Sequence, residues 1–158
     1  MEQTPAAPAL ANPATILVVD DEEAVLRILG QWVQHLGYAL RSADSADAAV
    51  AELERGGVAA ALCDVRMPGR DGLWLVDQVR DRFPDVAVVL VTGLDELDAG
   101  VTLRPGVVGY VTKPFERETI SASIRSALAW HQSHPGGATG SESLFDLATH
   151  WEPTETAS

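Results

Sequence analysis

The chain contains a single cysteine, Cys63, and few basic residues among its 158 positions. One cysteine excludes a disulfide framework and a zinc site made of several thiolates. Lys and Arg number 11 against 23 Asp and Glu, which gives a formal net charge of −12. Because nucleic-acid affinity depends largely on cationic side chains that neutralise phosphates, this balance argues against a stand-alone DNA or RNA binder. We expect no direct nucleic-acid partner, and a cationic or metal partner instead.

Long hydrophobic runs are also absent. The longest apolar runs, such as residues 86–91, are about a third of the roughly 20 residues that a membrane-spanning helix requires. The N-terminal stretch has no basic residue and no long apolar block, so it does not resemble a secretory signal. We therefore expect a cytoplasmic protein that does not bind membranes.

The two ends differ in composition from the middle. Residues 1–14 are rich in Ala and Pro and carry one charge, so we expect a disordered leader. Residues 131–158 contain four acids and no Lys or Arg, which predicts an acidic, flexible tail. Residues 15–130 remain as one globular domain. Apolar residues at helical spacing in the tail favour a short amphipathic helix near residues 142–151, which could dock on this domain, a second copy or another protein: Leu144, Leu147, Ala148 and Trp151.

Short apolar runs alternate five times with helical patterns across residues 15–130. This order predicts an α/β fold, a (βα)5 doubly wound parallel sheet of five strands with helices on both faces. The fourth helix should be short or irregular, because the stretch before Gly106 has low helix propensity, with Gly100, Val101, Thr102 and Pro105. The expected strands are residues 16–19, 38–42, 58–63, 86–91 and 107–111.

Reactive side chains follow four of the five expected strands. The first strand ends at Asp20 and Asp21, the third at Asp64, the fourth at Thr92 and the fifth at Lys113. Ligands of an open parallel sheet bind beyond the carboxyl ends of its strands, so these groups should converge at one edge. Three carboxylates held together repel one another unless a cation lies among them, and hard oxygen ligands suit Mg²⁺. A carboxylate can also attack phosphorus, so the set predicts phosphoryl transfer.

Four motifs in this order resemble the receiver domain of two-component response regulators: VVDDEE at 18–23, CDVRMPGRDG at 63–72, VTG at 91–93 and GYVTKPF at 109–115. The resemblance spans roughly residues 15–130 and implies a flavodoxin-like strand order of 2-1-3-4-5. It also implies a phosphoacceptor switch that assists its own phosphorylation and dephosphorylation, and not an enzyme. The phosphoryl donor would be a sensor histidine kinase or a histidine phosphotransfer protein.

The resemblance assigns a role to each motif residue. Asp64 would be the phosphoacceptor; Asp20, Asp21, Asp64 and the backbone carbonyl of Arg66 would hold Mg²⁺, for which Mn²⁺ could substitute. Thr92 and Lys113 would bind phosphoryl oxygens, and Thr92 and Tyr110 would form the switch. The Lys113–Pro114 peptide bond would be cis. An unknown downstream protein would read the switch, and a homodimer is a further option, although the shortened fourth-helix region puts the family's usual dimerisation face in doubt.

Several alternatives stay open at this point. The chain could be a Mg²⁺-dependent phosphohydrolase with an aspartate nucleophile, or a receiver-like scaffold that works unphosphorylated. Asp20 and Asp21 could form a turn or a helix cap, and Tyr110 could be an ordinary core aromatic. Cys63, on an apolar strand, is better explained as a small buried side chain than as a redox thiol.

Overall fold

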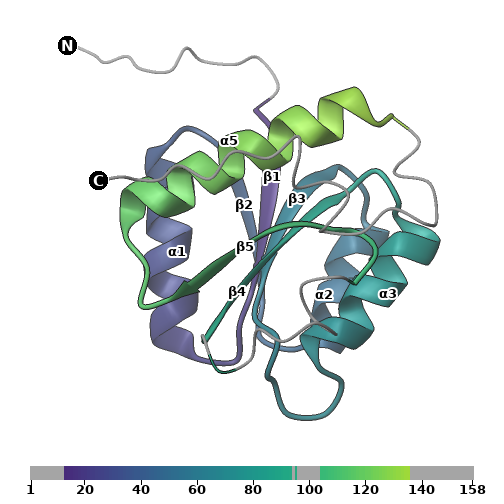
Figure 1. Ribbon diagram of the computed structural model, residues 1–158, viewed down its shortest axis with the longest axis horizontal. Coiled ribbons are helices and arrows are strands. Elements are labelled where there is room, and N and C mark those ends of the chain that lie inside the picture. Colours follow the sequence, from purple (N-terminus) through teal and green to yellow (C-terminus); the bar gives the residue numbers. More distant parts are fainter. Residues whose placement is uncertain (1–12, 94, 96–103, 136–158) are drawn as a thin grey trace.

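The computed structural model describes residues 13–93, 95 and 104–135. Five parallel strands form one sheet in the order β2-β1-β3-β4-β5, which confirms the predicted fold class and strand order. Figure 1 shows the twisted sheet in the centre of the molecule. The elements are β1 (Thr15–Val19), α1 (Glu23–His35), β2 (Ala39–Ala43), α2 (Ala46–Glu54), β3 (Val58–Cys63), α3 (Gly72–Arg82), β4 (Ala87–Gly93), β5 (Val107–Lys113) and α5 (Arg117–Ser133).

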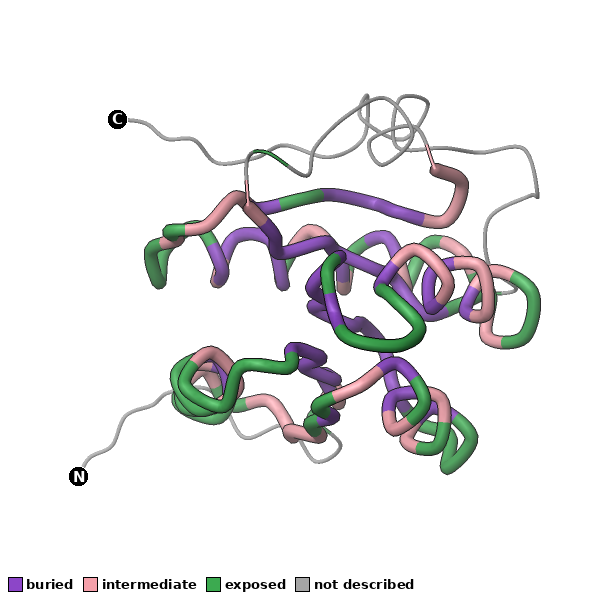
Figure 2. Tube along the Cα trace, turned by 90° about the horizontal axis from the view of Figure 1, so that it is seen from below, coloured by how far each residue is buried: buried purple, intermediate pink, exposed green. Residues whose placement is uncertain are grey.

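Helices cover both faces of the sheet. The helices α1 and α5 pack on one face, and α2 and α3 pack on the other (Figure 1). Each pair encloses its own apolar cluster, one around Val33 and Ile124 and the other around Leu53 and Leu75. Figure 2 shows the buried strands between the two layers of helices. Strands covered on both sides need apolar residues at successive positions, which explains the continuous apolar runs of β1, β3 and β4.

Local sequence signals set where two of the helices begin. The Ser45 hydroxyl accepts a hydrogen bond from the Ala48 N–H at 3.0 Å, and the Asp71 carboxylate accepts one from the Trp74 N–H at 2.9 Å. Each bond satisfies one of the backbone donors left free in a first helical turn, and such a cap is worth about 1 kcal/mol. The cap of α3 therefore fixes the end of the loop that follows Asp64.

The last helix, α5, continues to Ser133, beyond residue 130, because Trp130 is buried in the cluster shared with α1. Most of the stretch that was expected to form the fourth helix, residues 94 and 96–103, and the predicted tail helix lie outside the described residues. Across the described ranges, none of the helices is long and apolar enough to cross a membrane.

Candidate functional site

Three carboxylates meet at the carboxyl edge of the sheet. The pairing of Val19 with Cys63 aligns β1 and β3, so that Asp20 and Asp64 leave neighbouring strands at the same level. The Asp64 N–H donates to the Val19 carbonyl at 3.0 Å, which holds this alignment one residue beyond the strand. One oxygen from each of Asp20, Asp21 and Asp64 lies within 4.8 Å of the others. Asp20 and Asp64 are only 1% and 6% exposed, whereas Asp21 faces solvent.

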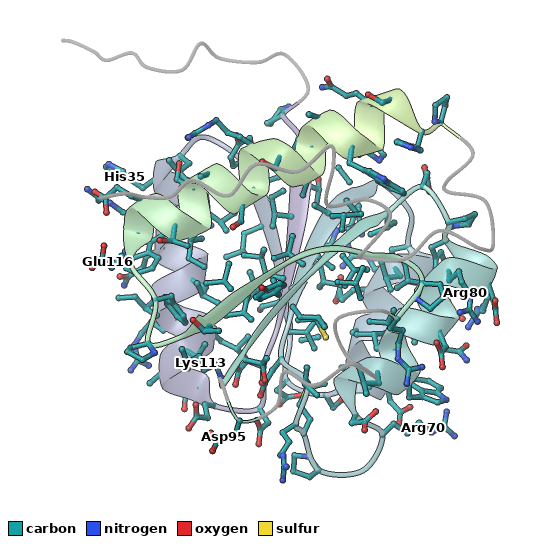
Figure 3. All side chains as sticks on the ribbon, viewed as in Figure 1. His35, Arg70, Arg80, Asp95, Lys113 and Glu116 are labelled. Atoms are coloured by element: carbon teal, nitrogen blue, oxygen red, sulfur yellow. The ribbon has the colours of Figure 1, made fainter. Side chains whose placement is uncertain are left out.

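Lys113, at the end of β5, supplies the positive charge of the site. Its Nζ donates to Asp20 Oδ2 at 2.9 Å and lies 3.7 Å from Asp64 Oδ1. A third carboxylate, Glu22 Oε1, lies 3.9 Å away. Burial opposes the charge on Lys113, but the hydrogen bond that Lys113 donates to Asp20 and the charges of Asp20 and Asp64 outweigh burial and raise the pKa of Lys113. Figure 3 labels Lys113 at this edge of the molecule.

The Asp64 carboxyl group has a strongly perturbed pKa. Burial is the main cause and the charge of Asp20 the next; with a smaller contribution from Asp21 they raise the pKa of Asp64 from 3.8 to about 6. Lys113 and a hydrogen bond to the backbone of Arg66 act in the opposite direction, but they are weaker. Without a cation, burial and the neighbouring carboxylates therefore make the charged form of Asp64 unfavourable.

Thr92 lies on β4 beside this group and is fully buried. Among the described residues its Oγ1 has no hydrogen-bond partner. A buried hydroxyl without a partner costs about 1–3 kcal/mol, so such groups require an explanation. A ligand oxygen at the carboxyl edge would supply the missing partner.

The loop after Asp64 is held against the start of α3. The Gly72 N–H donates to the Val65 carbonyl at 2.8 Å. A Cβ atom at Gly72 would overlap the carbonyl oxygen of Asp64 and lie 2.9 Å from Val65 Cα, so no larger residue fits. The motif at residues 63–72 contains this glycine, but the close packing of Gly72 against the acceptor peptide was not predicted from it. Glu22, in the motif at residues 18–23, was likewise not predicted to contribute to the site, yet its N–H donates to Asp20 Oδ1 at 2.9 Å.

The remaining predicted residues are placed as follows. Tyr110 is 38% exposed on the edge strand β5, so it is not a core aromatic. The Lys113–Pro114 peptide bond is cis. Cys63 is fully buried, and burial raises the pKa of its thiol, in agreement with a small core side chain. The Arg66 side chain is exposed, and its backbone contacts the Asp64 carboxyl group.

The donor set fits a magnesium ion. The three grouped side chains offer only carboxylate oxygens, the hard ligands that Mg²⁺ prefers. Two of them are buried, and their mutual repulsion already appears in the raised pKa of Asp64, so a divalent cation among them would relieve a cost present in the fold. An acidic triad of this kind is typical of a Mg²⁺ site.

Comparison with known proteins agrees with this geometry. Residues 16–125 match the response regulator receiver domain family. The uncharacterised transcriptional regulatory protein YkoG of Bacillus subtilis is 36% identical over 114 residues, which is 72% of this chain and 50% of that protein. The response regulator protein FleR of Pseudomonas aeruginosa is 35% identical over 117 residues, 73% of this chain and 25% of that protein. The chain thus matches half or less of the length of these two relatives.

Solved structures give the same result. A CheY-like receiver domain from Methanospirillum hungatei superposes with a TM-score of 0.73 at 27% identity, covering 78% of this chain and 99% of that one. The response regulator TrrA of Thermotoga maritima, solved in complex with Mg²⁺ and BeF, gives a TM-score of 0.63 at 25% identity, covering 72% and 98%.

The fold and its acidic edge thus define a doubly wound α/β domain with an acidic site of the kind that is typical of Mg²⁺ binding. The chain belongs to the response regulator receiver domain family. A receiver domain is a phosphoacceptor switch and not a catalytic enzyme, which sets the phosphohydrolase alternative aside. Membership also implies a cognate histidine kinase.

Proposed function

We propose that this chain accepts a phosphoryl group on Asp64 from a histidine kinase or a phosphotransfer protein, in a Mg²⁺-dependent reaction. The observation that carries the proposal is the position of Asp64, a buried carboxylate that shares one site with two other carboxylates and lies 3.7 Å from Lys113 Nζ. This is the combination that phosphoryl transfer needs, a nucleophile together with groups that neutralise the phosphoryl charge.

Each residue of the site would have a separate role in the phosphoryl transfer. An Asp64 oxygen forms the new bond to phosphorus, the phosphorus–nitrogen bond of the phosphohistidine breaks, and the imidazole nitrogen keeps the electron pair and takes up a proton. Asp20, Asp21 and Asp64, with the Arg66 backbone carbonyl, would hold the metal ion. The Mg²⁺ ion would neutralise charge on the phosphoryl oxygens. Lys113 would exchange part of its contact with Asp20 for a phosphoryl oxygen.

Thr92 would convert the bound phosphoryl group into a change of shape. Its hydroxyl, which has no hydrogen-bond partner in the described part of the chain, lies on the strand next to that of Lys113, in register with Thr112, and would donate to a phosphoryl oxygen. That bond supplies a differential interaction between the unphosphorylated and phosphorylated states, which any ligand-driven shift requires. Tyr110, exposed on the adjacent strand, would report the shift to a downstream protein by changing its exposure.

Phosphorylation with a small donor tests the proposal. The protein is incubated with acetyl phosphate and Mg²⁺, and intact-mass spectrometry should detect one added phosphoryl group. The group should be absent in Asp64→Asn and present in the matched control Asp81→Asn, which changes an exposed carboxylate on α3. Label retained in Asp64→Asn would refute the acceptor assignment, and no label in the wild-type chain would favour the scaffold alternative.

Removal of the metal tests the second part. Chelation with EDTA should abolish labelling, and Asp21→Asn should lower it strongly while leaving the buried Asp20–Lys113 pair intact. Mn²⁺ should restore labelling after chelation. Equal labelling with and without a divalent cation would contradict the metal assignment.

A further inference from the structure

A shallow hollow of about 290 Å³ lies where the end of α1 meets the first half of α5. None of its lining residues belongs to the carboxylate site. Figure 3 shows His35, at the end of α1, and Glu116, just before α5, on the same side of the molecule. The lining residues are His35, Leu36, Arg117, Glu118, Ser121 and Arg125.

The two arginines of this hollow differ from most others in the described part of the chain. Neither Arg117 nor Arg125 has a carboxylate within 4.0 Å among the described residues, although Glu118 also lines the hollow. Arg125 donates from Nη1 to Ser121 Oγ at 2.8 Å. Six arginines elsewhere each lie within 4.0 Å of an Asp or Glu: Arg27, Arg55, Arg70, Arg80, Arg82 and Arg104.

This arrangement favours the binding of a negatively charged segment at the hollow. In a chain with 23 acids and 11 Lys and Arg, most exposed guanidinium groups find a carboxylate nearby. Two exceptions in the described part of the chain lie beside one hollow, whose lining holds Arg117 and Arg125 against the single carboxylate of Glu118, together with a hydroxyl and an imidazole. Such guanidinium groups attract negatively charged segments over a distance of about 10 Å at moderate salt.

The chain itself carries a suitable segment. Residues 142–155 contain four acids and no Lys or Arg, together with the apolar residues that favour an amphipathic helix. The connecting chain is also long enough for the segment to reach the hollow. From Ser133 back to Arg125 is eight residues of helix, about 12 Å, and to Arg117 it is about 24 Å. The seven Cα-to-Cα steps from Pro135 to Glu142 can span up to about 25 Å.

We propose that residues 142–155 fold back along α5 and dock over this hollow, with Arg117 and Arg125 paired to the acids of the segment and Leu36 in contact with its apolar residues. Exposed ion pairs are individually weak, so the contact depends on the tether, which keeps the segment at an effective concentration in the millimolar range. Docking is therefore reversible and sensitive to salt. It covers part of α5 and excludes other acidic partners from the same arginines.

A spin label on the segment tests the proposal in the full chain. Cys63 is 0% exposed, so Ser143→Cys introduces the one cysteine that a nitroxide reagent reaches. In ¹H–¹⁵N spectra at low salt, the amide signals of Ser121 and Arg125 should lose most of their intensity, while those of α3 keep theirs. The signals should return in about 1 M NaCl, where the Debye length is about 3 Å.

Paired variants separate charge complementarity from simple proximity. Arg117→Gln with Arg125→Gln should restore the lost intensity. The control pair, Arg27→Gln with Arg55→Gln, changes two exposed arginines on α1 and after α2 and should leave the loss unchanged. A well-dispersed spectrum establishes that each variant is folded. The proposal would be overturned if the amide signals of Ser121 and Arg125 stayed weak in the first pair of variants. It would also be overturned if the loss appeared instead at the separate hollow lined by Asp85 and His131.

The same label distinguishes the chain's own segment from that of a second copy. Unlabelled ¹⁵N protein is mixed with spin-labelled ¹⁴N protein, and Ser121 and Arg125 should keep their intensity. Intensity lost in the mixture would mean that the segment docks between molecules, which contradicts the proposal. So would full intensity at these two residues in the labelled chain at low salt.

Discussion

Replacement of Asp64 by asparagine should make the metal-free protein more stable. The folded state raises the pKa of Asp64 from 3.8 to about 6, chiefly through burial and then through repulsion from Asp20. Above both values, the unfolded chain accommodates the Asp64 charge better than the folded one does. Each pKa unit corresponds to about 1.4 kcal/mol, so a shift of about two units sets an upper limit of about 3 kcal/mol for the gain on removing the charge.

The pH dependence identifies the cause. Between about pH 4 and pH 6 the folded state holds the Asp64 proton and the unfolded state does not, so the stability that this group contributes falls as pH rises. The advantage of Asp64→Asn over the wild type should therefore be near zero below about pH 4 and complete above about pH 7. Asp81→Asn, the exposed control, should stay within about 0.5 kcal/mol of the wild type.

Urea denaturation in EDTA at a series of pH values provides the measurement. The free energy of unfolding should be higher for Asp64→Asn at pH 7.5, with an unchanged dependence on urea concentration. A variant that is no more stable than the wild type at pH 7.5, or an advantage that does not shrink on acidification, would refute the electrostatic account of this site. Mg²⁺ should narrow the difference, because the cation stabilises the wild-type carboxylates.

Four further outcomes follow from the same contacts. Mg²⁺ at ten times its dissociation constant should stabilise the wild type by about 1.4 kcal/mol in thermal melts, and have less effect on Asp64→Asn. Lys113→Ala should cost about 3 kcal/mol in urea denaturation, because Asp20, 1% exposed, would lose its cation. Thr92→Val should raise stability by about 1 kcal/mol, since it removes a buried hydroxyl that has no partner among the residues described, yet it should abolish phosphorylation-dependent spectral change. Gly72→Ala should cost about 3 kcal/mol or more, because its Cβ overlaps the Asp64 carbonyl.

The fold could be predicted largely because its strands are covered on both sides. Residues 58–63 are apolar at every position, and every residue of β3 is buried. A parallel sheet also brings strand ends to one edge, so the order of Asp20, Asp64 and Lys113 along the sequence was enough to predict that they meet.

Side-chain geometry within the site could not be predicted in the same way. Lys113 lies closer to Asp20, at 2.9 Å, than to Asp64, at 3.7 Å, and this difference depends on rotamers and on the twist of the sheet. The exposure of Tyr110 depends on which face of β5 it occupies and on the position of β5 at the edge of the sheet. Similarly, the absence of carboxylate partners for Arg117 and Arg125 within residues 13–93, 95 and 104–135 is a property of the folded surface, and the sequence contains no signal for it.

Gly72 has a consequence for how the molecule moves. The α-carbon of Gly72 lies directly against the backbone of Asp64 and Val65. The first turn of α3 therefore cannot move away from the acceptor peptide without losing this contact. It cannot move closer either, because the backbone atoms would overlap. A displacement of the acceptor peptide must therefore carry the start of α3 with it. The side chains of Arg70 and Trp74 stack at this point, with the guanidinium 4.4 Å from the ring centre. They would move together with the acceptor peptide and so carry its displacement to the surface of the molecule.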